Sequence, residues 1–292
     1  MMPRMRNLLG FFYFIPRFIR KKFHLFSAGP KGFLKVLLYH DIPPHFHDTF
    51  RSHITLAHRI YNFIDIVEFE QMMSGLIPIH GENILLTFDD GFKSNRSIAE
   101  QILDPLGIKA LFFVTTDFLD CNARNDQKEF VAQKIFEGKI SSEDIPDYLS
   151  PLSWSDLEIL LENGHTIGSH TKSHRRLSEI TRASELEEEI VGSRAILHKK
   201  LGVEIKNFAY PFGDFKSINT EAALCAQKHY LYAFSGVRGE NHPKIVRYLL
   251  RRESLSIEDS APYMRFIIDG GLSWYYSHKR KYLDSMGETI ET

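Results

Sequence analysis

The stretch ILLTFDDGF, residues 84–92, joins an apolar run to a strongly polar end. The apolar run predicts a buried strand of a parallel sheet. Asp89 and Asp90 then stand side by side, and Gly91 permits the positive φ of a sharp turn. A DDG sequence after a strand marks a turn more often than a site. Two adjacent carboxylates are also explained if a cation neutralises one of them and the other stays free as a base.

Similar apolar runs recur along the chain and alternate with helical patterns, which predicts β/α units and a mostly parallel sheet. Roughly seven such units favour a barrel over an open sheet, and catalytic groups of such barrels collect at the carboxyl ends of the strands. The other runs cover residues 33–39, 109–115, 165–169, 206–210, 230–235 and, less clearly, 248–257.

Two helices are predicted from the residues at their ends. Residues 153–164 start at a plausible cap and end at a glycine. Residues 178–202 carry glutamates near the start, basic residues near the end and Gly202 as a C-terminal cap. That charge order suits the helix dipole, so we interpret these charges as a solvated face. Residues 120–150 read as a polar, irregular insert.

The composition is that of a soluble globular protein of 292 residues, with a formal net charge of -1. This balance argues against a nucleic-acid binder. Two cysteines outside any metal-binding spacing argue against a disulfide scaffold or a zinc ribbon. We expect a barrel domain over residues 33–283, a basic N-terminal segment over residues 1–32 and a frayed tail over residues 284–292.

The N-terminal segment differs from the rest, because residues 1–35 hold eight Lys or Arg, several phenylalanines and no acid. Its apolar run, residues 8–15, is too short to span a bilayer and makes a poor signal peptide. Residues 1–30 could lie in a membrane interface, or could pack on the globular body. The expected location is the cytoplasm, with peripheral contact to the inner face of the membrane under the first reading.

A second polar strand end holds two histidines. His170 and His174 follow the predicted strand around Ile167. If the chain turns into a helix there, both rings share one side. Two imidazoles and one carboxylate with open positions make a catalytic metal site, so the two strand ends together predict one. A third stretch, NFAYPFGDF (207–215), follows another predicted strand and either walls a groove or is a plain loop with core aromatics.

Three motifs resemble those of the NodB-type polysaccharide deacetylases, carbohydrate esterase family 4. They are TFDDG (87–91), GHTIGSHTKSH (164–174) and FAYPFG (208–213), and LLYHDIP (37–43), LFFVTT (111–116) and LSW (152–154) also resemble family members. The resemblance spans roughly residues 34–257. It implies a distorted (β/α) barrel of seven or eight units and a divalent metal, commonly Zn²⁺. The implied activity removes acyl groups, usually N-acetyl, from amino sugars of polysaccharides or glycolipids.

The resemblance also implies roles for single residues. Carried over by motif, Asp89 is the general base, and Asp90, His170 and His174 are the metal ligands. The metal polarises the carbonyl and binds the attacking water, and the base takes the proton of that water. The turn Tyr210, Pro211, Phe212 would contact the oxyanion or the substrate, with the backbone N–H of Phe212 as the candidate donor to the oxyanion.

Two departures from the family pattern concern the base and the acid. Many members carry an arginine that orients the base where this chain has Ala209. A subgroup with a YP version of the motif carries an arginine on the last strand instead, for which Arg252 is the candidate and Arg251 the next. The family's usual catalytic-acid histidine in a Leu-x-Leu-His stretch is missing. His40, at the end of the first predicted strand, could enter the site in its place.

Several functions remain open from the sequence. The first is a metal-dependent deacetylase of a cell-envelope glycan. The second is a non-catalytic glycan-binding relative that keeps the fold, which the missing arginine and histidine favour and the retained Asp89 disfavours. The third is a deformylase or O-deacetylase that uses the same groups. The expected partner is in each case a carbohydrate.

Overall fold

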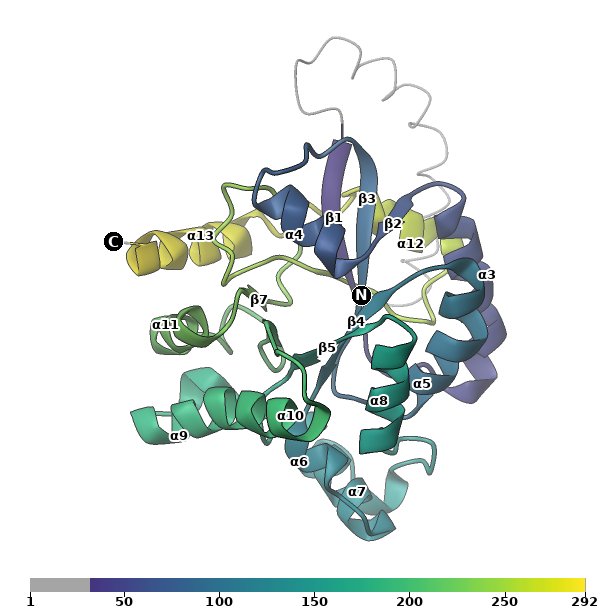
Figure 1. Ribbon diagram of the computed structural model, residues 1–292, viewed down its shortest axis with the longest axis vertical. Coiled ribbons are helices and arrows are strands. Elements are labelled where there is room, and N and C mark those ends of the chain that lie inside the picture. The colour runs from purple at the N-terminus through teal and green to yellow at the C-terminus, as the bar shows by residue number, and fades with distance from the viewer. Residues whose placement is uncertain (1–31, 292) are drawn as a thin grey trace.

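The computed structural model describes residues 32–291, and its centre is a parallel sheet that curls into an incomplete barrel (Figure 1). The strand order is β7-β6-β5-β4-β3-β1-β8, and β2 pairs with β3 outside this path. The distorted (β/α) barrel predicted from the sequence is thereby confirmed. The strands are β1 (Gly32–Tyr39), β2 (Asn62–Ile64), β3 (Gly81–Phe88), β4 (Ala110–Val114), β5 (Thr166–Ser169), β6 (Asn207–Ala209), β7 (Tyr232–Phe234) and β8 (Glu253–Ser254).

Strand β3 is buried on both faces over its second half, as its apolar sequence predicts. Leu85 joins an inner cluster with Val36, Leu111 and Phe113, whereas Leu86 faces the cluster beneath the surrounding helices. β3 pairs with β1 along its whole length, while β2 and β4 share its other edge. The carboxyl ends of β1 and β3 therefore lie side by side, and the residues that follow them meet.

The barrel is distorted where its two end strands should meet. β7 and β8 share no ladder, and the chain between them is joined to β7 by a single parallel bridge, Phe234↔Leu250. The strand β2, which the sequence analysis missed, is only three residues long. β6 and β7 are equally short but lie inside the predicted runs 206–210 and 230–235, whereas β2 begins at the polar Asn62 and is followed directly by Asp65.

Helices surround the sheet and connect successive strands (Figure 1). The larger ones are α3 (His47–His58), α4 (Ile66–Met73), α5 (Ser94–Ile98), α6 (Thr116–Leu119), α7 (Arg124–Phe130), α8 (Trp154–Glu162), α9 (Ala183–Glu187), α10 (Ser193–Leu201), α11 (Thr220–His229), α12 (Ala261–Ile268) and α13 (Ser277–Glu291). Short 3-10 turns lie at Pro44–Phe46, Asp104–Leu106, Ser142–Asp144 and Leu177–Glu179, and π-helical turns at Ala99–Leu103, Val131–Ile135 and Glu188–Gly192.

The predicted helices are present with one difference. Ser153 and Asp156 form a capping box at the start of α8, and Gly202 ends α10 in the left-handed conformation. Between α9 and α10, however, the turn Glu188–Gly192 widens to π geometry. Such π-turns often occur near functional sites.

Two predictions about boundaries are corrected by the structure. The insert at 120–150 is not irregular, since α7 and the following π-turn pack a small core of their own that includes Phe118, Val131 and Ile145. The tail is not frayed either: α13 continues to Glu291 and buries Leu283, Met286 and Ile290 along one side. Their i, i+3, i+7 spacing is the helical period that the sequence analysis overlooked.

The basic N-terminal segment, residues 1–31, lies outside the described residues, so its role remains a prediction. Among the residues that the structure does describe, none of the helices has the length and apolar character needed to cross a bilayer.

Candidate metal centre and its surroundings

The paired aspartates stand at the carboxyl end of β3, and both are about 2% exposed. The N–H of Asp89 donates to the carbonyl of Tyr39 at 2.9 Å, which continues the pairing with β1 by one residue. Asp90 then takes a positive φ of 73°, followed by Gly91 at 88°. In a simple strand, successive side chains would point to opposite faces, but after this reversal both carboxylates lie near Nε2 of His170, at 3.9 Å for Asp89 and 3.4 Å for Asp90. Non-glycine residues with positive φ are uncommon and often mark functional sites.

The two histidines come from the loop after β5, which is not a helix. Thr171 (φ 68°) and His174 (φ 60°) both adopt the left-handed conformation, and the N–H of His174 donates to the Thr171 hydroxyl at 3.0 Å. The conditional expectation of a helical turn is therefore corrected. The loop still brings the rings together, with 5.1 Å between the centroids of His170 and His174.

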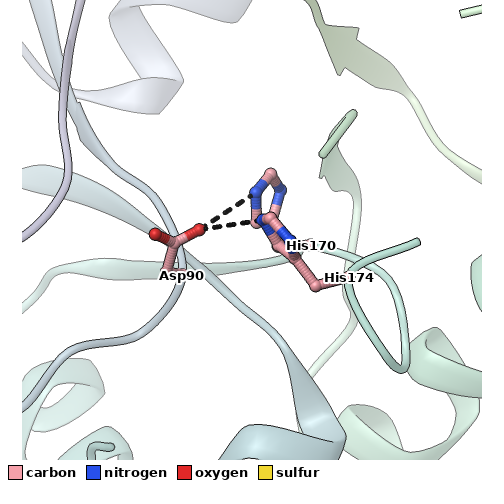
Figure 2. A group of neighbouring side chains, drawn as sticks. All are labelled: Asp90, His170 and His174. Atoms are coloured by element: carbon pink, nitrogen blue, oxygen red, sulfur yellow. Dashed lines mark ion pairs between the residues drawn. The ribbon is translucent and has the colours of Figure 1, made fainter. Parts of the chain in front are cut away.

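Asp90, His170 and His174 point toward one another from the ends of β3 and β5, the two strands on either side of β4 (Figure 2). Oδ1 of Asp90 lies 3.4 Å from Nε2 of His170 and 3.2 Å from Nε2 of His174. The ligand atoms of all three side chains lie within 4.8 Å of one another, and all three residues are buried. In the part of the chain described, this is the only such group of three or more potential metal ligands.

In each histidine ring, the hydrogen bond made by Nδ1 indicates that Nε2 is the unprotonated nitrogen that faces the cluster. Nδ1 of His170 lies 2.8 Å from the carbonyl of Ala209, and Nδ1 of His174 lies 3.0 Å from the carbonyl of Lys134. A carbonyl only accepts, so each Nδ1 donates its proton. Each neutral ring then presents the lone pair of Nε2 to Asp90. Backbone carbonyls orient metal-binding histidines in this manner in many proteins.

The donor set fits a divalent cation. Two Nε2 lone pairs and a carboxylate oxygen converge, and Oδ1 of Asp90 is buried without a hydrogen-bond partner. Without a cation or an added proton, three electron-rich atoms would repel one another in a buried setting. Two histidines and a carboxylate are also the ligand types of catalytic zinc sites.

The directions of the pKa shifts of Asp90 and His174 also favour a bound cation. Burial alone would raise the pKa of Asp90, but the two adjacent imidazoles outweigh burial and hold that pKa well below its ordinary value. Burial would likewise lower the pKa of His174, but the Asp90 carboxylate outweighs it and raises that pKa. Asp90 is therefore a carboxylate at neutral pH, as cation binding requires.

The guanidinium of Arg252 forms a bidentate ion pair with the carboxylate of Asp89. Its Nη1 and Nη2 donate to the two carboxylate oxygens, each at 2.7 Å, and its Nε donates to the carbonyl of Ser235 at 2.8 Å. The guanidinium also lies over the ring of Phe113, 5.4 Å from its centroid. Arg252 is completely buried, so this bidentate pair is shielded from water. The neighbouring Arg251 turns away and binds Asp284, which leaves Arg252 as the arginine at Asp89.

The loop after β6 brings Phe212 to the cluster, with its ring 4.7 Å from that of His174. Phe212 has a positive φ of 61°, and the guanidinium of Arg176 stacks on its ring at 4.1 Å. Pro211 is buried beside it. Gly213 is required here, because a Cβ would lie 2.4 Å from the backbone nitrogen of Gly236. The chain therefore reverses tightly at the edge of the site.

Tyr210 does not reach this edge with its side chain. The ring is fully buried in the helix-side core, and its hydroxyl donates to the carbonyl of Tyr248 at 2.8 Å. Its N–H donates to the carbonyl of Phe234. The expected substrate contact through Tyr210 is therefore corrected: the residue supports the loop from inside.

His40 follows β1 directly and is exposed. Its carbonyl accepts a hydrogen bond from the side chain of Asn95 at 2.9 Å, which ties it to the segment after the paired aspartates. Its ring lies near enough to Asp90 to favour the ionised form of that carboxylate. The next residue, Asp41, is partly buried, and burial raises its pKa to about 6. An exposed imidazole thus lies within electrostatic reach of the cluster.

Glu189 supports the histidine loop from the π-turn between α9 and α10. Its carboxylate accepts the N–H of Ser173 at 2.8 Å and the hydroxyl of the same serine, and its carbonyl accepts the N–H of Lys172 at 3.0 Å. The side chain is only 4% exposed. The interpretation of the charges on this helix as a purely solvated face is corrected here, and no signal in the sequence distinguishes Glu189 from the neighbouring glutamates.

Comparison with known proteins agrees with this fold and its motifs. The family model described as "Polysaccharide deacetylase" matches residues 78–232, more than half of the chain. No curated protein matches the chain significantly. Solved structures with the same fold include the Streptococcus pyogenes deacetylase PplD in complex with acetate, at 18% identity and a TM-score of 0.64, which covers 81% of this chain and 98% of that one.

Two further structures are similar over nearly their whole length. IcaB from Ammonifex degensii is 21% identical with a TM-score of 0.59, and covers 81% of this chain and 97% of its own. A de-N-acetylase from Aggregatibacter actinomycetemcomitans is 16% identical with a TM-score of 0.61, and covers 80% and 99%. At these identities the structures establish a shared fold, while the residues matched by the family model, 78–232, include the three strand-end motifs. The chain therefore belongs to the polysaccharide deacetylase family.

Proposed function

We propose that this protein is a metal-dependent hydrolase that removes an acyl group, most suitably N-acetyl, from an amino sugar of a polysaccharide or glycolipid. The observation that carries the proposal is the position of the Asp89–Arg252 pair beside the cluster of Asp90, His170 and His174. Oδ2 of Asp89 lies 3.9 Å from Nε2 of His170, so the base candidate adjoins the cation site without belonging to it.

Each residue then has one task. Asp90, His170 and His174 would hold the ion, Zn²⁺ by donor set, which when bound supplies Lewis acidity toward a carbonyl oxygen and a water. Asp89 accepts the proton of the attacking water at a carboxylate oxygen. Arg252 donates to both oxygens of that carboxylate and fixes its direction.

The remaining roles are assigned to residues at the edge of the site. The backbone N–H of Phe212 donates to the developing oxyanion at the tight turn beside His174. His40 donates a proton to the leaving amine from the end of β1. Tyr210 and Pro211 act only by holding that turn in place.

Two alternatives are weaker on this geometry. A glycan-binding relative without activity would need no second carboxylate next to the cation site. A buried ion pair such as Asp89–Arg252 is costly to desolvate, so its retention favours a chemical role. Deformylation or O-deacetylation would use the same groups. One similar structure is a deacetylase in complex with acetate and another is a de-N-acetylase, which supports the N-acetyl group.

The test is acetate release from N-acetylglucosamine oligomers by the zinc-loaded protein, measured with an enzyme-coupled acetate assay. Formyl and O-acetyl analogues of the same sugar run in parallel and separate the acyl groups. Zinc-loaded protein that binds the oligomers but releases no acyl group from any of them would establish the glycan-binding alternative.

Replacing Arg252 by Met should destabilise the protein by about 3–5 kcal/mol, because it leaves the buried Asp89 carboxylate without its partner. The measurement is denaturant unfolding of the metal-free protein. Arg182→Met is the control, since the Arg182 side chain is 79% exposed in its pair with Glu185 and such pairs contribute about 1 kcal/mol or less. The double variant Asp89→Asn/Arg252→Met should recover part of the loss. Equal destabilisation by the two single arginine variants contradicts the prediction.

Replacing Glu189 by Gln should weaken zinc binding about tenfold, in the range known for outer contacts of metal ligands. The charge that holds the Ser173 N–H and hydroxyl is lost, so His174 is less well positioned. Zinc affinity is measured by competition with a chromogenic chelator. Glu188→Gln is the control, because Glu188 binds the same loop only through an exposed pair with Lys172. If both variants bind zinc as the unmodified protein does, Glu189 has no positioning role.

The expected location, the cytoplasm with peripheral contact to the inner membrane face through residues 1–30, stays a proposal. It rests on the basic, phenylalanine-rich sequence of that segment.

A further inference from the structure

An exposed patch lies at the junction of α12 and α13, far along the chain from the strand-end motifs. We call it the aromatic-basic patch. Its exposed members are Trp274, Tyr275, His278, Lys281 and Tyr282, and the half-buried Lys279 completes it. Trp274 is 77% exposed, Tyr275 56% and Tyr282 46%. Of the large hydrophobic side chains that are exposed within residues 32–291, Trp274 is the most exposed. Exposed apolar surface of this kind commonly marks an interaction site.

The patch is basic, whereas residues 32–292 as a whole are acidic. Residues 32–292 contain 29 Lys or Arg and 37 Asp or Glu, a formal net charge of −8. Residues 270–283 contain three Lys or Arg, one His and no acid. An acidic body is repelled by an anionic partner, so contact with such a partner is favoured through a local basic region.

The patch is held in a defined position by its neighbours. Leu283, Met286 and Ile290 bury one side of α13, next to α11 (Figure 1). The guanidinium of Arg280 donates to the carbonyls of Ser273 at 2.6 Å and Arg238 at 3.3 Å. The segment before α13 is therefore fastened to the connection between β7 and β8.

The patch also borders the loop that carries Phe212. The ring of Phe215, three residues further along this loop, lies 5.6 Å from the ring of Tyr282, and the ammonium of Lys279 lies 5.4 Å from the Phe215 ring. Phe212 contacts His174 of the cation site. One short loop thus links the patch to the candidate metal centre.

The ring directions decide between two anionic partners, a glycan and a lipid surface. The rings of Trp274 and Tyr275 are tilted by 83° to each other, and those of Tyr275 and Tyr276 by 75°. Successive sugars stack on aromatic faces, and perpendicular neighbours provide no common face. Insertion among lipid headgroups needs no common plane. Trp and Tyr beside Lys are the residues enriched at that depth.

We propose that the aromatic-basic patch docks on an anionic lipid surface, so that the loop bearing Phe212 is held near the membrane. The indole of Trp274 and the ring of Tyr275 enter the headgroup region, and Lys279 and Lys281 pair with lipid phosphates. This contact is separate from any made by residues 1–30. It also does not depend on the proposed hydrolysis.

The test is sedimentation of the full-length protein with vesicles of phosphatidylcholine and phosphatidylglycerol, compared with vesicles of phosphatidylcholine alone. Trp274→Ala/Tyr275→Ala and Lys279→Gln/Lys281→Gln should each lower the partition coefficient on the anionic vesicles about tenfold or more. In the unmodified protein, Trp274 fluorescence should shift to shorter wavelength on binding, and Trp154→Phe protein isolates that signal.

Matched substitutions elsewhere serve as controls. Leu76→Ala removes an equally exposed apolar side chain, and Lys199→Gln/Lys200→Gln removes two exposed charges from the end of α10. Both should leave partition unchanged. The proposal is overturned if the patch variants sediment as the unmodified protein does, or if the controls lose as much. It is also overturned if the patch variants keep vesicle binding and instead lose affinity for an anionic oligosaccharide.

Discussion

Purified His174→Ala protein is expected to lose most of its bound zinc, with an affinity reduced by more than about 100-fold. Removing an outer contact of a ligand already costs about 10–100-fold, and removing a ligand costs more. Only His170 and Asp90 would remain, and two ligands hold a divalent ion poorly. Elemental analysis after dialysis against a fixed free-zinc concentration measures the loss.

The control for this prediction is His198→Ala. His198 is an exposed histidine at the end of α10 whose ring donates to the carbonyl of Val203, away from the cluster. It should keep full occupancy. Full occupancy in His174→Ala protein, with its fold intact by circular dichroism, would remove His174 from the ligand set.

Asp89→Asn protein is expected to keep its zinc and lose about 10²–10⁴ of its acetate-releasing rate, the usual contribution of a general base. The amide fills the same space but cannot take the proton of water. Arg252 also loses its charged partner, so a stability loss accompanies the change.

The comparison with Asp144→Asn separates the two effects. Asp144 is exposed in the insert and should leave rate, zinc and stability unchanged. Rates are compared at equal zinc occupancy and at a temperature where both variants are folded. A wild-type rate for Asp89→Asn protein would mean that Asp89 is not the base.

The sequence alone could predict the architecture, because the alternation of apolar runs and helical patterns is a local property of the chain. It could also predict which residue types stand at the ends of β3 and β5. Parallel strands bring their carboxyl ends to one side of the sheet, so residues distant in sequence, such as Asp90 and His170, meet without further information. The pairing of Asp89 with Arg252 was reachable as a hypothesis, since the missing arginine at Ala209 required a replacement.

Other features could be known only from the tertiary structure. The carbonyls of Ala209 and Lys134 orient the two imidazoles, yet every residue has a carbonyl and no side chain announces which one is used. The insert was underestimated for this reason, although it supplies one of them. Positive φ at Asp90 and His174 depends on surroundings that hold the backbone against its own preference.

The sequence also does not decide which charged side chains are buried. Glu189 and its neighbour Glu188 are identical in type, but the first is 4% exposed and bonds the histidine loop, whereas the side chain of the second is 61% exposed. Which glutamate turns inward depends on the π-turn and on the approach of residues 171–174. Local pattern therefore determines strands, helices and candidate ligands, and long-range packing determines which polar groups are buried, oriented and paired.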